Sequence, residues 1–91
     1  MQTRIHAIIS GTVQGVFYRA STQNEAKKLD LKGFVRNLPD GTVELEAQGE
    51  STDIDTLLDW CWQGPPDCKV TRVTSEVIAR VPGGGVFEIR R

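Results

Sequence analysis

The sequence predicts a small α+β domain in which two helices cover one face of an antiparallel β-sheet. Three observations support this prediction: short runs of alternating apolar residues, two longer segments with helical spacing, and turn residues between them. The chain has 91 residues, of which 38% are hydrophobic and 25% are charged. That length predicts one domain, residues 1–91, with a modest core.

The first two elements are a strand and a helix. Residues 4–10 read as a strand, because Ile5, Ala7 and Ile9 fall on one face. Residues 17–30 read as a helix that is rich in Ala, Gln, Glu and Lys, which are good or fair helix formers. A nine-residue segment with two glycines, residues 11–19, follows the strand and runs into the start of the helix, and it is analysed below.

A hairpin follows the first helix. Residues 33–38 and 42–48 read as strands, and Leu38-Pro39-Asp40-Gly41 is a strong turn signal between them. In the second of these strands, apolar and acidic residues alternate, so that one face is buried and the other is charged. The residues are Val43, Leu45 and Ala47 inward, and Glu44 and Glu46 outward.

The second helix has the clearest amphipathic pattern. Apolar side chains recur at i, i+3, i+4 and i+7, namely Ile54, Leu57, Leu58 and Cys61. We expect Ser51 or Thr52 to cap its start, and Gly64-Pro65-Pro66 to end it.

Two strands complete the chain. In the strand over residues 70–79, Val70 and Val73 are out of phase, which predicts a bulge or bend. A mobile hairpin loop is expected over residues 80–85, followed by a strand at 86–90. The order is therefore βαββαβ plus a terminal strand, for which a ferredoxin-like split βαβ sandwich is the natural topology, with a sheet of four to five antiparallel strands.

Composition excludes several function classes. Eleven Lys and Arg against twelve Asp and Glu give a formal net charge of −1, which argues against a dedicated nucleic-acid binder. No apolar run is long enough for a secretory signal or a membrane span, so we expect a cytoplasmic monomer.

Neither the cysteines nor the single histidine indicates a metal site. The spacing of Cys61 and Cys68 fits no zinc pattern, and free thiols are expected in a reducing compartment, with a bridge between them left open. His6 has no second ligand or acidic neighbour in the sequence, and we assign it no role.

The segment Gly11-Thr12-Val13-Gln14-Gly15-Val16-Phe17-Tyr18-Arg19 indicates an anion-binding loop. Backbone N–H groups at a helix start can point at an anion, and the helix dipole favours negative charge. Arg19 adds a planar fork of donors that matches phosphate geometry. The segment lacks Gly-x-Gly-x-x-Gly, so it is not the dinucleotide-binding motif, and it lacks Gly-Lys-Ser/Thr, so it is not the nucleotide P-loop. On spacing alone, a tight turn without a ligand explains the glycines equally well.

Two motifs make the chain resemble the acylphosphatase family. The family's first signature, Gly-x-Val-Gln-Gly-Val-x-Phe-Arg, matches residues 11–19, with Tyr18 in place of the usual Phe. The second matches Gly33-Phe34-Val35-Arg36-Asn37 and the turn that follows. The resemblance covers essentially the whole chain.

The resemblance implies metal-free hydrolysis of the carboxyl–phosphate bond of small-molecule acyl phosphates, giving a carboxylate and inorganic phosphate, with no cofactor. It also implies that Arg19 and the backbone amides of the loop hold the phosphoryl group or another oxyanion, and that Asn37 positions the attacking water. The loop residues concerned are Gln14, Gly15, Val16, Phe17, Tyr18 and Arg19.

Three other functions remain open at this point. A phosphate-sensing module would bind without turnover and would have no need of Asn37 as a water-positioning group. An RNA-binding sheet would need aromatic and basic residues on its central strands, where Glu44 and Glu46 stand instead. The chain also resembles the acylphosphatase-like unit of larger carbamoyl-transfer proteins. Individually, Arg19 could be a structural arginine and Asn37 a turn residue.

Overall fold

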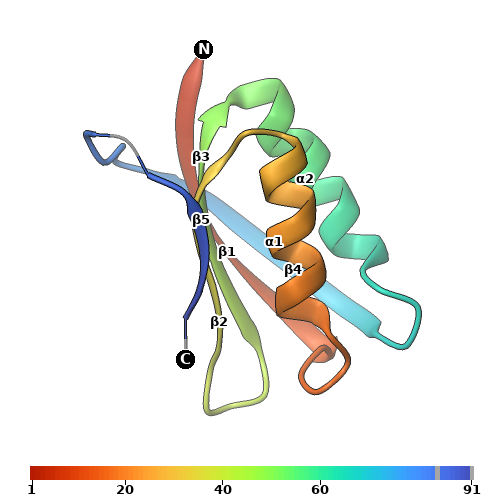
Figure 1. Ribbon diagram of the computed structural model, residues 1–91. Helices are drawn as coiled ribbons and strands as arrows, with labels where there is room; N and C mark the ends of the chain where they lie inside the picture. Colours follow the sequence, from red (N-terminus) through yellow and green to blue (C-terminus); the bar gives the residue numbers. More distant parts are fainter. Residues whose placement is uncertain (84, 91) are drawn as a thin grey trace.

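Two helices pack on the same face of a five-stranded sheet (Figure 1). The computed structural model describes residues 1–83 and 85–90. The strand order in the sheet is β4-β1-β3-β2-β5, which confirms the ferredoxin-like prediction. Along the chain the elements are β1 (Gln2–Thr12), α1 (Tyr18–Lys28), β2 (Lys32–Asn37), β3 (Val43–Glu50), α2 (Ser51–Gln63), β4 (Lys69–Ile78) and β5 (Phe87–Arg90).

The direction of the last strand differs from the prediction. β1 pairs antiparallel with β3 and β4, and β2 pairs antiparallel with β3. β5, however, runs parallel to β2, with Gly33 opposite Phe87 and Val35 opposite Ile89. The sheet is therefore mixed rather than fully antiparallel, because the chain leaves β4 at one edge and adds β5 at the opposite edge.

The segment between β4 and β5 is consequently no hairpin loop. It runs from one edge of the sheet to the other, and Gln48 of β3 holds it on the way. The Gln48 side chain donates to the Val81 carbonyl at 3.0 Å and accepts from the Val81 N–H at 2.8 Å. The expected hairpin connection is wrong for the described residues, because β5 pairs with β2 and not with β4, while Gly84 lies outside the described residues.

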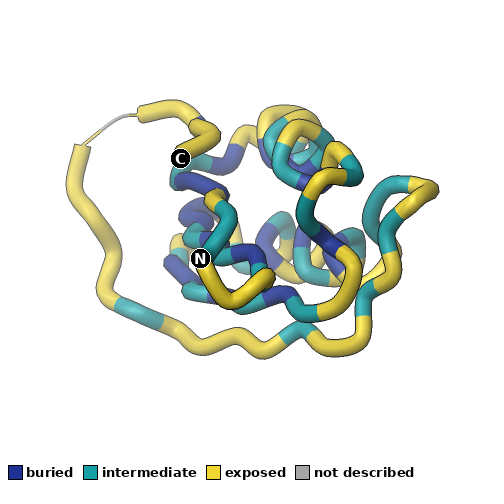
Figure 2. Tube along the Cα trace, turned by 90° about the horizontal axis from the view of Figure 1, so that it is seen from below, coloured by how far each residue is buried: buried dark blue, intermediate teal, exposed yellow. Residues whose placement is uncertain are grey.

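The core lies between the sheet and the two helices. The inward residues of β3, Val43, Leu45 and Ala47, are fully buried, as predicted from their alternation. Of the predicted face of α2, Ile54, Leu57 and Cys61 are buried, whereas Leu58 packs at the margin. Figure 2 shows these buried segments gathered inside, with β4 exposed along most of its length at the sheet edge. No helix in the described ranges is long and apolar enough to cross a membrane.

The start of α2 is satisfied by backbone rather than by a side-chain cap. The helix begins at Ser51, directly after β3, and its N-cap position, Glu50, makes no side-chain capping bond. The Ser51 N–H instead donates to the Met1 carbonyl at 2.9 Å. The expected cap by Ser51 or Thr52 is therefore wrong, because the helix begins at Ser51 itself and Met1, directly before β1, accepts from its N–H.

The predicted bulge is present where β4 meets β1. Ser10 pairs with Arg72 and Gly11 with Val70, so the register shifts between these pairs. Gly11 has φ +124°, and a Cβ there would lie 2.0 Å from the Lys69 carbonyl oxygen. The first glycine of the loop motif thus permits close approach of two strands rather than of a ligand.

Tyr18 ties the start of α1 to the end of α2. Its hydroxyl donates to the Cys61 carbonyl at 2.7 Å, and both side chains are buried. Cys61 lies in the last turn of α2, and the residue four positions later is Pro65, which has no N–H to offer. Burial raises the pKa of the Tyr18 hydroxyl, and it raises the pKa of the Cys61 thiol to about 12. Cys61 is therefore a core residue.

Replacing Tyr18 by Phe keeps the buried ring but leaves the Cys61 carbonyl without this donor. We expect the free energy of unfolding to fall by about 1–2 kcal/mol, measured by urea denaturation. Thr56→Ala is the control, because it removes an exposed hydroxyl–carbonyl bond within α2 and should change the value by less than about 0.5 kcal/mol. Equal stability of Tyr18→Phe and the unmodified protein would show that the Tyr18–Cys61 hydrogen bond does not stabilise the fold.

Candidate active site

The loop between β1 and α1 presents a series of backbone N–H groups. Gly15 and Phe17 both have positive φ, +75° and +65°, which turns the chain sharply into the helix. The Ser21 N–H donates to the Phe17 carbonyl as the first bond of α1. Within the described residues, no backbone carbonyl accepts from the amides of residues 14–20. These amides and the helix dipole make the loop suitable for an anion.

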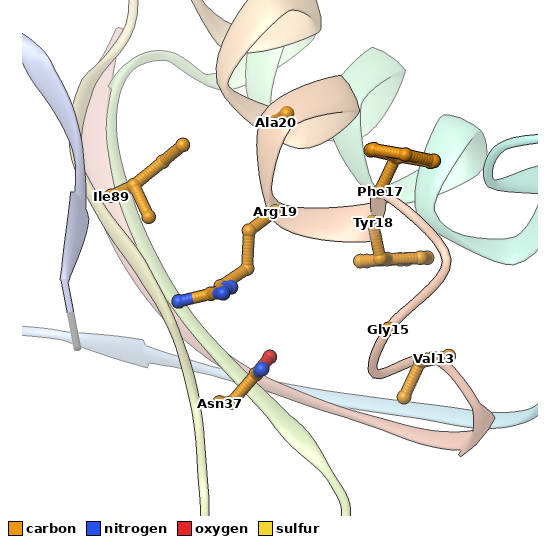
Figure 3. Close-up of a pocket in the computed structure, with 8 residues that line it drawn as sticks. All are labelled: Val13, Gly15, Phe17, Tyr18, Arg19, Ala20, Asn37 and Ile89. Carbon is orange, nitrogen blue, oxygen red and sulfur yellow. The ribbon is translucent and has the colours of Figure 1, made fainter.

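A pocket of about 310 Å³ opens beside this loop (Figure 3). Its walls come from the loop, the first turn of α1, the end of β2, and β5. The residues are Val13, Gly15, Phe17, Tyr18, Arg19, Ala20, Asn37 and Ile89. The pocket therefore collects residues from both sequence motifs and from the terminal strand.

Arg19 supplies the positive charge of the pocket. It lies at the start of the helix, as predicted, as the second residue of α1, and its side chain reaches toward the strand end that carries Asn37 (Figure 3). Its Nη1 donates to the Arg90 carbonyl at 3.4 Å. Among the described residues no carboxylate lies within 4.0 Å of it. A half-buried cation at a helix start, without a partner carboxylate, suits an anionic ligand.

Asn37 contributes a polar atom without a partner. It is the last residue of β2 and lies on the same face of the sheet as Val35, the face that α1 covers. Its Oδ1 is buried and has no hydrogen-bond partner in the described structure. Buried side-chain oxygens are nearly always paired, so this acceptor is suited to a water or ligand hydrogen.

The side chain of Gln14 holds the loop against the β2–β3 hairpin. Its Nε2 donates to the Leu38 carbonyl at 2.8 Å and to the Thr42 carbonyl at 2.9 Å. Leu38 directly follows Asn37, so these two bonds join the loop to the strand end that carries the asparagine. The sequence motif contains Gln14 but does not reveal this use of its side chain.

The structure places the predicted site residues in two groups. Gly15, Phe17, Tyr18, Arg19 and Asn37 line the pocket. Two others, Gln14 and Val16, belong to the loop but do not line the pocket, so any contact with a ligand would come from their amides.

Sequence reasoning missed three lining residues, Val13, Ala20 and Ile89. For Ile89, the alternation of apolar residues in the terminal strand indicated only that its side chain shares a face with Phe87, and did not indicate a place in the pocket. Nothing in the sequence shows that β5 lies beside β2.

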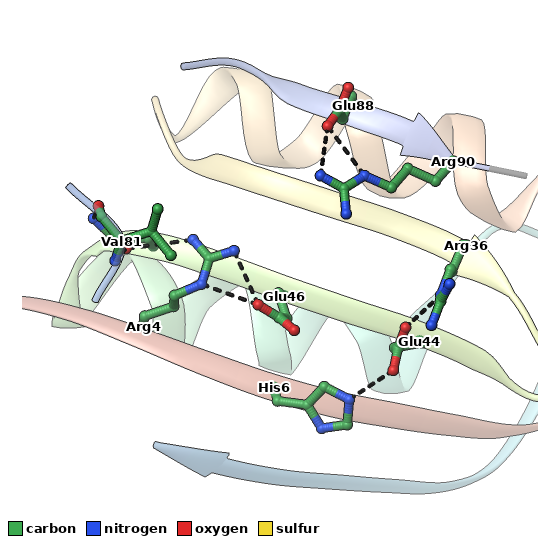
Figure 4. A network of polar contacts seen from close by, with 9 residues as sticks. Arg4, His6, Arg36, Glu44, Glu46, Val81, Glu88 and Arg90 are labelled. Atoms are coloured by element: carbon green, nitrogen blue, oxygen red, sulfur yellow. Dashed lines mark hydrogen bonds and ion pairs between the residues drawn. The ribbon is translucent and has the colours of Figure 1, made fainter. Parts of the chain in front are cut away.

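A ladder of charged residues occupies the opposite, uncovered face of the sheet (Figure 4). His6 Nε2 lies 2.9 Å from Glu44 Oε2, and Nδ1 lies 3.9 Å from Glu76 Oε1. Burial pushes the pKa of Glu44 upward, but hydrogen bonds from His6 and Arg36 outweigh it and lower the pKa. Strand pairing thus gives His6 the acidic neighbours that its sequence surroundings lack.

This ladder lies outside the pocket. In residues 1–83 and 85–90, no group of three or more His, Cys, Asp or Glu side chains is arranged to hold a metal ion.

The fold and the pocket define a class: a ferredoxin-like sandwich with a loop suited to an oxyanion at the start of its first helix. The acylphosphatase family model matches residues 5–89. The acylphosphatase of Haloquadratum walsbyi is 47% identical over 90 residues, which are 99% of this chain and 96% of that protein.

Solved structures give the same result. An acylphosphatase from Coxiella burnetii superposes with a TM-score of 0.92 at 45% identity, covering 98% of this chain and 93% of that one. For the acylphosphatase from Bacillus subtilis the TM-score is 0.93 at 33% identity, with both chains fully covered. The chain belongs to the acylphosphatase family, and its activity is the hydrolysis of acyl phosphates.

Replacing Gln14 by Met keeps the side-chain length and removes both donors. The two carbonyls keep backbone donors, from Leu38 N–H to Thr42 and from Gly41 N–H to Leu38, so the free energy of unfolding should fall by only about 1–2 kcal/mol. The kcat for acetyl phosphate should fall on the order of tenfold to a hundredfold, because the loop is no longer held in register with Asn37. Reduced stability with an unchanged kcat would reduce Gln14 to a structural role.

Proposed function

We propose that Arg19 and the loop amides bind the phosphoryl group of the acyl phosphate, and that Asn37 orients the attacking water. One observation carries the proposal: Asn37, whose buried Oδ1 has no hydrogen-bond partner in the described structure, lines the same pocket as Arg19. This arrangement offers one acceptor for water and several donors for an oxyanion. A phosphate-sensing module would use only the donors.

Binding of the phosphoryl group rests on charge and on fixed geometry. The guanidinium fork matches two phosphate oxygens, and the amides of the first turn of α1 add donors that the helix itself does not use. Phosphoryl transfer asks mainly for positioning and for stabilisation of charge on the equatorial oxygens. Donors held by the backbone need little reorganisation as that charge develops.

In the proposed reaction, Asn37 holds the water that attacks phosphorus. Asn37 Oδ1 accepts a hydrogen bond from the water, and the water oxygen bonds to phosphorus. The bond between phosphorus and the acyl oxygen breaks, and the carboxylate leaves with the electron pair. An amide cannot take the water's proton, so the proton passes to a phosphate oxygen of the substrate.

The titratable groups of the pocket are consistent with transfer of the proton to the substrate phosphate. Of the eight lining residues, the ionisable ones are Arg19 and Tyr18, and burial raises the pKa of the Tyr18 hydroxyl. We propose accordingly that kcat shows no enzyme pKa near neutrality. Since the carboxylate is a good leaving group and Arg19 supplies the charge, the proposed route needs neither a metal ion nor a cofactor.

The proposal extends to the setting of the enzyme. We propose a cytoplasmic monomer that acts on small molecules and also binds inorganic phosphate in the loop. The uncovered sheet face carries paired acidic and basic residues, including Glu44 with Arg36 and Glu46 with Arg4, which disfavours nucleic acid as a partner.

Replacing Arg19 by Ala removes the cation from the pocket. We expect kcat/KM for acetyl phosphate to fall on the order of a hundredfold or more, by analogy with the loss of an oxyanion donor. Arg19→Lys should recover part of the loss, because it restores the charge without the fork. Arg36→Ala, which removes an arginine from the opposite sheet face, is the control. A folded Arg19→Ala protein with full turnover would contradict the proposal.

Replacing Asn37 by Ala removes the acceptor for water. We expect kcat to fall on the order of a hundredfold while the inhibition constant of inorganic phosphate stays nearly constant, both measured with EDTA present. Loss of phosphate inhibition together with turnover would show that Asn37 holds the loop instead. Absence of turnover in the unmodified protein, with phosphate still bound, would indicate the phosphate-sensing module.

A further inference from the structure

We propose that the apolar end of the pocket, formed by Phe17, Ala20 and Ile89, binds the acyl group of the substrate. It selects acyl phosphates whose acyl group is uncharged and apolar, with Phe17 as the main specificity-determining residue. This inference rests on the proposed function, because it takes the phosphoryl group to lie between Arg19 and the loop amides.

Phe17 is an unusual residue for its position. Its side chain is 81% exposed, so it adds little to the core. Its backbone is left-handed, with φ +65°, which costs an L-residue with a Cβ roughly 1–2 kcal/mol. Glycine would take this conformation without that cost. A large apolar ring at a strained and exposed position that lines the pocket is therefore suited to contact a ligand.

The geometry of the reaction points the acyl group toward this end. In phosphoryl transfer the attacking and leaving oxygens lie roughly in line through phosphorus. Asn37 lies on one side of the Arg19 guanidinium, while Phe17, Ala20 and Ile89 lie on the other (Figure 3). With water held at Asn37, the leaving carboxylate points toward the three apolar side chains.

The size and charge of the pocket define the class of acyl group. Its volume of about 310 Å³ lies at the lower end of the range for small-molecule sites, so a phosphate leaves room for a further group. Arg19 is the one charged residue among the eight that line it. Among the described residues that line the pocket, an acyl group with its own carboxylate or phosphate would meet no second cation. Ile89, 36% exposed on β5, adds apolar surface opposite Phe17.

The test compares kcat/KM for benzoyl phosphate with kcat/KM for acetyl phosphate. The two leaving groups differ in intrinsic reactivity, so the readout is the change in this ratio between variants. Both substrates carry the same phosphoryl group, so any disturbance of the loop amides cancels in the ratio. We expect Phe17→Ala to lower the ratio about tenfold, as for the loss of a contact in an apolar pocket.

Three further variants sharpen the test. Phe17→Tyr keeps the ring and should keep the ratio, and Phe17→Leu should give an intermediate ratio if the alanine variant fails to fold. Trp62→Ala is the matched control, because Trp62 is an aromatic residue that is 53% exposed on α2 and does not line the pocket.

The outcomes separate the two proposals. A ratio that falls in Phe17→Ala and holds in Phe17→Tyr and Trp62→Ala supports the inference. An unchanged ratio in Phe17→Ala or Phe17→Leu, with both substrates still hydrolysed, overturns the inference and leaves the proposed function standing. Hydrolysis of neither substrate by the unmodified protein overturns both.

Discussion

Two hydrogen bonds from one glutamine side chain determine where the parts of this site lie. Gln14 donates to the carbonyls of Leu38 and Thr42, at opposite ends of the β2–β3 connection. The loop carries the amides that we propose bind the phosphoryl group, and β2 ends at Asn37, the proposed acceptor for water. Apart from this bridge, the two motifs are connected through β3, which pairs with both β1 and β2, and through the packing of α1 on the sheet. The proposed catalytic arrangement therefore includes a bridging residue that does not line the pocket.

A strained loop is held in place by the residue that follows it. Phe17 is left-handed, at a cost of roughly 1–2 kcal/mol, while its neighbour Tyr18 is almost fully buried. Burial of an aromatic side chain stabilises by about 1.5–3 kcal/mol, and the Tyr18 hydroxyl bond to Cys61 adds to that. The core therefore offsets the local strain. The buried Tyr18 ring and its bond to Cys61 hold the start of α1, and with it the end of the loop, against α2.

Local patterns in the sequence were enough to predict most of the elements. The alternation in β3, the helical spacing in α2 and the phase change in β4 all appear in the structure, since each depends on neighbouring residues. The position of Arg19 at a helix start was predictable for the same reason. The start of α2 was not, because its first N–H is satisfied by Met1, fifty residues earlier in the chain.

By itself, the sequence determined the strands and helices, their buried faces, and the chemical character of the two motifs. Periodicity and turn chemistry act over a few residues, and a single chain displays them directly. Only the tertiary structure decided that β5 runs parallel to β2, that His6 meets Glu44, and that Ile89 shares a pocket with Arg19. These contacts join residues far apart in the chain, and strand order and register create them. The specificity for the acyl group that we propose also depends on such a tertiary contact, because it needs Ile89 of β5 beside the loop.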